Sequence, residues 1–253
     1  MKRFKMRHTI YGSETEFTDA DAPLFLKGGR AGSTMDDQWF WDEHIKALRV
    51  GESEHTDYHE ITCIDCGVSV AESDRDRVVF SVPINDHDTR YMRVMPSPNP
   101  DNVFVVMVDG EAFYHAWMAC AQGSPADCVP REDMPHDSKY GGAVDGFERA
   151  QSMDDPVPLA ECTPYADSGM AMIGFNNGVT RTLWLLANRV PVFPVKVVGR
   201  SQAELLNSIA GADRSPYALS DLFPSADEEN LVMVAVSPDE HRQKHHGSEH
   251  LQR

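Results

Sequence analysis

Residues 177–181 read Asn-Gly-Val-Thr-Arg, a combination suited to holding an anion. The Asn-Gly pair follows the apolar run Ala171–Phe175, which predicts a strand, and the apolar spacing over Val179–Ala187 predicts a helix immediately after the turn. The first backbone amides of a helix have no intrahelical acceptor and carry partial positive charge. A strand that turns directly into a helix therefore offers a site for phosphate or carboxylate groups.

The side chains at this turn fit the same chemistry. Gly178 permits a positive φ or a close approach of backbone, Thr180 adds a hydroxyl group, and Arg181 supplies a forked cation. We predict a nucleotide or phosphate site formed by Asn177, Gly178, Thr180 and Arg181, and we assign no catalytic residue and no metal ligand. The spacing alone also fits a simple strand-to-helix turn with a solvated Arg181, because Asn-Gly turns are common.

The elements around this turn follow from periodicity and breakers. Downstream, we expect a strand over Val192–Val198, a Ser-x-x-Glu capping box at Ser201–Glu204 that opens a helix ending before Gly211, a short helix near Ala218–Leu222 and a last strand over Leu231–Val236. Upstream, we expect a helix within Met35–Arg49, an antiparallel meander of Val78–Ile84, Tyr91–Met95 and Val103–Val108, and a helix over Glu111–Ala121. Gly123–Pro158 predicts a long loop with a short helix near Val144–Gln151, a candidate lid or partner-binding surface.

The charge balance limits the partners. The chain has 253 residues with 23 Lys plus Arg against 40 Asp plus Glu, a formal charge of −17. Such a charge repels a polyanion unless cations gather in one place, so nucleic acid is disfavoured and a protein partner or small ligand is favoured. The basic start of the chain lacks the apolar run of a signal peptide, and the sequence has no apolar stretch of about 18 residues for a membrane span. We expect a cytoplasmic location, and the five scattered cysteines fit a reducing compartment.

A second group of residues has ligand chemistry. His55, His59, Cys63 and Cys66 are of the types that bind zinc, but a zinc finger generally separates its two ligand pairs by about a dozen residues. The segment Thr62–Ile64 fits a strand edge equally well, and free thiols account for the two cysteines. Zinc binding by these four residues stays open at this point.

The turn also carries a family resemblance. Residues 174–186 read Gly-Phe-Asn-Asn-Gly-Val-Thr-Arg-Thr-Leu-Trp-Leu-Leu, and residues 191–197 read Pro-Val-Phe-Pro-Val-Lys-Val. This segment resembles the strand, Asn-Gly-Arg-His-Arg turn, helix and Pro-Val strand of the ParB/sulfiredoxin-like superfamily, and within it the plasmid fertility inhibition factors. Asn177, Gly178 and Arg181 match that motif, whereas Val179 and Thr180 stand where the family has Arg and His.

The resemblance implies a fold and a choice of functions. Sulfiredoxins use a Cys in this turn, and Val179 at that position cannot act as a nucleophile. The missing His removes a proton shuttle, which argues against the nuclease or ATPase activity of other members, while Arg181 keeps an anion site. Fertility inhibition factors act by blocking the coupling machinery of conjugation, so the resemblance implies a protein partner there.

Together these observations predict one α+β domain over residues 1–238, with an N-terminal extension, a ParB/sulfiredoxin-like mixed sheet and packed helices, followed by a disordered charged tail over residues 239–253. The expected function is inhibition of conjugative plasmid or DNA transfer by binding the coupling ATPase, with an altered nucleotide site. No cofactor is certain, and a nucleotide is the candidate. One alternative is a nucleotide-hydrolysing or DNA-cleaving enzyme of the same fold. Another is a ligand- or zinc-binding regulatory module.

Overall fold

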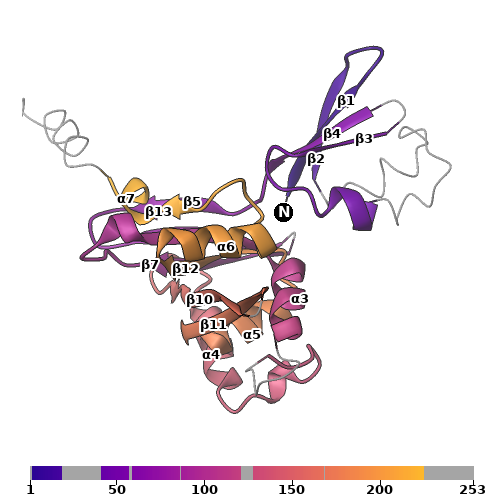
Figure 1. Ribbon diagram of the computed structural model, residues 1–253. Helices are drawn as coiled ribbons and strands as arrows, with labels where there is room; N and C mark the ends of the chain where they lie inside the picture. Colours follow the sequence, from indigo (N-terminus) through magenta and orange to yellow (C-terminus); the bar gives the residue numbers. More distant parts are fainter. Residues whose placement is uncertain are drawn as a thin grey trace, which may run out of the picture.

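The structure is a computed structural model that describes residues 2–18, 41–56, 59–85, 87–120, 128–167 and 169–224, without the side chains of residues 42, 43 and 120. In these ranges the chain forms three β-sheets and five α-helices, a mixed α+β fold (Figure 1). The strands are β1 (Arg3–His8), β2 (Glu14–Thr18), β3 (Ser53–His55), β4 (His59–Asp65), β5 (Ser69–Ser73), β6 (Val78–Asn85), β7 (Asp88–Val94), β8 (Val103–Asp109), β9 (Val157–Pro158), β10 (Ala160–Asp167), β11 (Met170–Asn177), β12 (Val192–Val198) and β13 (Tyr217–Ala218). The helices are α3 (Gly110–Cys120), α4 (Tyr140–Arg149), α5 (Val179–Ala187), α6 (Arg200–Ala210) and α7 (Leu219–Leu222), with a π-helical turn η1 (Trp41–Ile45) and the 3₁₀ turns η2 (Pro100–Asn102) and η3 (Met134–His136).

The N-terminal sheet has a hydrophobic core of its own. Its strand order is β2-β1-β4-β3, with antiparallel neighbours throughout. Apolar side chains on alternate positions of β1 and β4 point to one face, where η1 covers them. Phe4 contacts Trp41 edge to face with ring centroids 5.1 Å apart. Figure 1 shows this sheet at the upper right, beside the main body of the chain.

The central sheet is mixed and carries the turn of interest. Its order is β11-β10-β12-β8-β13, and the pairing of β10 with β12 is parallel while the other neighbours are antiparallel. Six consecutive residues of β8, Val103–Val108, are buried, which is typical of a strand covered on both faces. Phe175 on β11 packs against Trp117 of α3, with ring centroids 4.7 Å apart.

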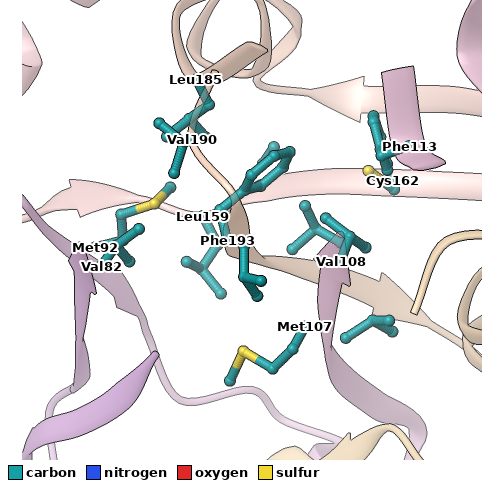
Figure 2. Close-up of a cluster of buried hydrophobic side chains, with 14 of the residues drawn as sticks. Val82, Met92, Met107, Val108, Phe113, Leu159, Cys162, Leu185, Val190 and Phe193 are labelled. Atoms are coloured by element: carbon teal, nitrogen blue, oxygen red, sulfur yellow. The ribbon is translucent and has the colours of Figure 1, made fainter. Parts of the chain in front are cut away.

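The third sheet, of order β5-β6-β7-β9, completes the main core. Figure 2 shows Val82 of β6 and Met92 of β7 beside the apolar side chains of the central sheet and of α5. Phe193 of β12 lies in the same cluster and is fully buried. The main core therefore joins the second and third sheets into one body.

Polar contacts join the N-terminal sheet to that body. The ammonium group of Lys2 lies 3.0 Å from a carboxylate oxygen of Asp109, at the end of β8. Arg49 donates to the carbonyl oxygen of Ser208 at 2.9 Å, and Arg214 donates to the carbonyl oxygen of Gly51 at 2.9 Å. The backbone amide of Val50 also donates to the main body. The junction is thus made mainly by hydrogen bonds, with Val50 as an apolar contact to both cores.

Several expectations are confirmed. Helix α5 and strand β12 have the bounds predicted for them, and α3 and α7 each begin within one residue of the expected start. Of the predicted helix Met35–Arg49, the described part contains η1 alone. The strand predicted over Leu231–Val236 and the tail over residues 239–253 lie outside the described residues. That residues 1–238 form one domain remains our proposal.

Two expectations are wrong, and a third is confirmed with different bounds. Strand β8 does not pair with β7 in a meander, because its partners β12 and β13 come from distant sequence and place it in the central sheet. The short helix predicted near Val144–Gln151 is present as the ten-residue helix α4, which begins four residues earlier, ends at Arg149 and is held by burial of Phe147. No capping box forms at Ser201–Glu204, since α6 begins one residue earlier with Gly199 as its N-cap, and the hydroxyl group of Ser201 contacts Gln202 instead.

Candidate functional site

The turn between β11 and α5 is built around a glycine. Gly178 has a φ of 93°, in the left-handed region that favours glycine. A Cβ atom there would lie 2.7 Å from the Cα atom of Ala160 and 2.8 Å from a guanidinium nitrogen of Arg181. The residue therefore supplies both the conformation and the close approach that the sequence predicts for it.

Helix α5 begins with unpaired amides at this turn. The amide of Thr182 donates to the carbonyl oxygen of Gly178 at 3.0 Å, the first intrahelical bond, and the N-cap makes no side-chain capping bond. The amides of residues 179–181 precede that bond and have no acceptor within the helix. The start of α5 thus has the partial positive charge that an anion would complement.

Arg181 is half-buried beside this helix end. One guanidinium nitrogen donates to the carbonyl oxygen of Leu159 at 3.3 Å, while its Nε is buried without a hydrogen-bond partner among the described residues. Burial lowers the pKa of Arg181 from its usual value, because desolvation disfavours the charged form. A buried guanidinium with unused donors is suited to receiving an anion.

A pocket of about 300 Å³ lies in front of Arg181. Thr180 and Arg181 form one wall, and the face of α4 that carries Lys139, Gly142 and Gly146 forms another. Arg149 and Asp155 complete the charged lining. Three cations against one carboxylate make this pocket positive in a chain with a charge of −17.

The pocket depends on the packing of α4 against α5. The rings of Phe147 and Trp184 stack with centroids 4.0 Å apart and an angle of 14° between their planes. Both side chains are buried. This contact places Lys139 and Arg149, at the two ends of α4, around the pocket that includes the first turn of α5.

The four predicted site residues have different positions. Thr180 and Arg181 line the pocket, and Gly178 shapes the turn behind it. Asn177 is exposed at the end of β11, where its Cα atom pairs with that of Glu161, and it does not line the pocket. Sequence reasoning predicted a helix near Val144–Gln151 but did not assign Lys139 or Arg149 to the site. Apolar residues at 143, 147 and 150 have the helical spacing of α4.

The residues proposed as zinc ligands are spread along two strands. His59 and Cys63 lie on one face of β4 but four residues apart, a distance of roughly 13 Å along a strand. His55 is exposed on β3, and Cys66 is buried after β4. In the described ranges, no group of three or more His, Cys, Asp or Glu residues is arranged to hold a metal ion. We therefore propose no zinc site there.

The thiols have the properties of buried structural cysteines. Cys63 and Cys66 are free and buried, and burial raises the pKa of the Cys63 thiol to about 11. Burial likewise raises the pKa of Cys66. Since the thiolate is the reactive form, these side chains are inert near neutral pH. The interpretation of both residues as buried free thiols is confirmed.

Comparisons with known proteins agree on one family. A family model for plasmid fertility inhibition factors matches residues 105–211, which run from within β8 to the end of α6. The chain is 36% identical over 145 residues to Protein osa of Shigella flexneri, covering 57% of this chain and 74% of that relative. The crystal structure of the Oncogenic Suppression Activity Protein, a plasmid fertility inhibition factor solved as a gold(I) cyanide derivative, matches with a TM-score of 0.56 and 27% identity, covering 85% of this chain and 96% of that one.

The matched segment contains the turn, the pocket and most of the central sheet. Among the helices that the structure describes, none is long and apolar enough to cross a membrane. The family model, the similarity to a relative and the shared fold give the same result. This chain belongs to the plasmid fertility inhibition factor family.

Proposed function

We propose that this chain inhibits conjugative transfer of plasmid DNA by binding the coupling ATPase of the transfer machinery, and that Gly178, Thr180 and Arg181 form an altered nucleotide or phosphate site. Family membership supports the role in transfer. The single observation that carries the site is the positive pocket at the start of α5, because the rest of the chain is strongly acidic.

We also propose that the fold belongs to the ParB/sulfiredoxin-like superfamily. The order of β11, a left-handed glycine, α5 and β12 supports this placement, since it is the order expected from the resemblance. Val179 is half-buried beside the turn and carries no nucleophile. The chain therefore retains the scaffold of the superfamily turn and lacks the side chain used by sulfiredoxins.

An acidic surface suits the proposed mode of action. An inhibitor with a charge of −17 would be steered toward a basic surface, and an ATPase that handles DNA needs such a surface for its own substrate. Asn177 is exposed outside the pocket, so we assign it to the turn rather than to ligand contact.

The enzymatic alternative, a nuclease or nucleoside triphosphatase, has less support from the pocket. Asp155 is the one carboxylate among the described residues that line it, and it accepts a hydrogen bond from Arg149 at 2.9 Å. No His lines the pocket within the described part of the chain. A general base would have to come from Asp155 freed of its ion pair.

Conjugation assays test the proposed role. Donor cells expressing the chain should transfer several types of plasmid at a frequency at least tenfold below that of donors with an empty vector. Co-purification of the coupling ATPase with the tagged chain from the same donors identifies the partner. An unchanged transfer frequency for every plasmid type would overturn the proposed role.

Ligand binding tests the pocket separately. ATP, CTP and inorganic phosphate should raise the thermal midpoint of the wild-type chain, and Arg181→Ala should abolish the shift. Arg189→Ala, which removes an exposed arginine after α5, is the matched control and should keep it. Nucleotide turnover by wild type that is lost in Arg181→Ala would favour the enzyme instead. If wild type shows no shift with any of these ligands, the pocket is not a nucleotide or phosphate site.

A further inference from the structure

A second pocket, of about 430 Å³, lies along helix α6. Arg200, Glu204 and Ser208 line it from one face of that helix, since residues four apart lie above one another. Arg49, from the segment after η1, and Arg214, from the segment after α6, line the same pocket. Figure 1 shows α6 on the outside of the main body, near β13.

The pocket has cations at both ends and an acid in the middle. Arg200 is the first residue of α6, and Ser208 follows after eight residues, about 12 Å along the axis. At that far end, Arg49 donates to the carbonyl oxygen of Ser208 at 2.9 Å. Arg214 lines the pocket as well and is anchored on the carbonyl oxygens of Val50 at 3.1 Å and Gly51 at 2.9 Å.

The three guanidinium groups lack carboxylate partners. Among the described residues, no Asp or Glu lies within ion-pair distance of Arg49, Arg200 or Arg214, although the chain has 17 more acidic than basic residues. Each guanidinium has five N–H donors, so the bonds to backbone oxygens leave donors unused. Three guanidinium groups against the carboxylate of Glu204 make the described lining of this pocket positive, which indicates a site for an external anion.

The position of Arg200 has no explanation in the stability of α6. A cation at the first residue of a helix opposes the helix dipole, and the first turn of α6 has no acidic residue to offset it. The guanidinium of Arg200 lies 4.9 Å from the ring centroid of Phe104, which orients it over the pocket rim. The side chain is therefore held in place with its charge unneutralised.

We propose that this pocket binds an acidic segment of a protein partner, with one carboxylate on Arg200 and another on Arg49 and Arg214. An extended peptide covers about 12 Å in roughly four residues, so the two acids should stand about four positions apart. Glu204 between the cations excludes a continuous phosphate backbone, whereas a peptide can place an uncharged residue opposite it. This pocket is separate from the α5 pocket, and the acidic segment need not come from the coupling ATPase.

Fluorescence anisotropy with the full chain and labelled peptides tests this proposal. The peptide Gly-Glu-Gly-Ser-Gly-Glu-Gly should bind at low salt, and its Gln analogue should not. Arg200→Gln should weaken binding about tenfold, as expected for the loss of a charge-assisted hydrogen bond. Glu204→Gln should strengthen binding, which gives a readout of opposite sign that does not depend on removing an arginine.

Lys139→Gln is the matched control, because it removes one positive charge from an exposed residue of the other pocket. It should leave peptide binding unchanged. Equal weakening by Lys139→Gln and Arg200→Gln would mean that only net charge matters and would overturn the proposal. Tighter binding of a 20-nucleotide single-stranded DNA than of the peptide, lost in Arg200→Gln, would overturn it in favour of a nucleic-acid surface.

Discussion

Lys2 and Asp109 form an ion pair of 3.0 Å that joins the residue before β1 to the start of α3. The other carboxylate oxygen of Asp109 accepts hydrogen bonds from the amides of Glu111 and Ala112, so the same side chain caps the helix. The ammonium group of Lys2 also donates to the carbonyl oxygens of Lys46 and Leu48. One buried cation thus satisfies acceptors on two segments, the one after η1 and the end of β8.

Replacing that cation should destabilise the protein. Lys2→Met leaves a half-buried carboxylate and two carbonyl oxygens without their donor, and we expect a loss of about 2 kcal/mol in the free energy of unfolding. Lys5→Met is the matched control, because Lys5 pairs with Glu14 at the surface, where such pairs contribute at most about 1 kcal/mol. Urea denaturation of both variants measures the difference, and equal losses would contradict a special role for Lys2.

The glycine at the turn should be intolerant of a side chain. Gly178→Ala combines a positive φ with a Cβ atom 2.7 Å from the backbone of Ala160, and we expect a loss of about 3 kcal/mol. Gly169→Ala separates the two causes, since Gly169 has a φ of 83° and open space around it. That variant should lose only about 1 kcal/mol. Thermal denaturation that finds the two variants equally stable would show that the contact with Ala160 is relieved at little cost.

The aromatic stack behind the α5 pocket should control both stability and ligand binding. Phe147→Ala removes a buried ring from the contact with Trp184, with an expected loss of about 3 kcal/mol, whereas Phe147→Leu should lose about 1 kcal/mol. Tyr165→Ala, at a ring that is 49% exposed, should change stability by less than about 0.5 kcal/mol. Chemical denaturation measures all three, and an intact nucleotide shift in folded Phe147→Ala would separate α4 from the binding site.

Acid should weaken the N-terminal sheet through His59. Burial lowers the pKa of His59 in the folded chain, and neighbouring His8 lowers it further, with the two rings 4.8 Å apart. The unfolded chain then binds the proton more readily, so the stabilising contribution of neutral His59 is present above the unfolded pKa of about 6.5. It is lost as the pH falls from there toward the folded pKa.

A pair of denaturation series tests this dependence. Each unit by which the folded pKa lies below the unfolded one corresponds to about 1.4 kcal/mol. His59→Gln should show a smaller loss of stability between pH 7.5 and pH 5 than wild type, because the variant cannot take up that proton. Parallel pH profiles for the two proteins would rule out His59 as the group responsible.

The elements around the site were predictable where local signals agree. An Asn-Gly turn, a helical apolar pattern and a β-branched run occur together between residues 176 and 198, and the bounds of α5 and β12 follow directly. The alternation of Arg3, Phe4, Lys5 and Met6 also carries the period of a strand, and β1 was missed although that signal was present. The local sequence pattern therefore also predicts strand β1.

Long-range features were not predictable in the same way. Strand β8 is rich in β-branched residues, as β6 is, and its pairing with β12, some ninety residues later, and with β13 assigns it to the central sheet. Three glycines lower the helix propensity of α4, whose stability comes from tertiary burial of Phe147. The helix predicted near Val144–Gln151 therefore omitted the first turn of α4, and with it Lys139 at the pocket.

The N-terminal sheet has an apolar core of its own, which limits the cooperativity of unfolding between this sheet and the main body. Because its interior is filled by its own side chains and its attachment is largely polar, this sheet can open as a subglobal unit while the larger core stays closed. Amide hydrogen exchange should then divide the chain into two protection classes, with β1 and β4 in the faster class. The pocket along α6 takes Arg49 from the segment that anchors this unit, so occupancy by an anion would slow exchange across the whole sheet.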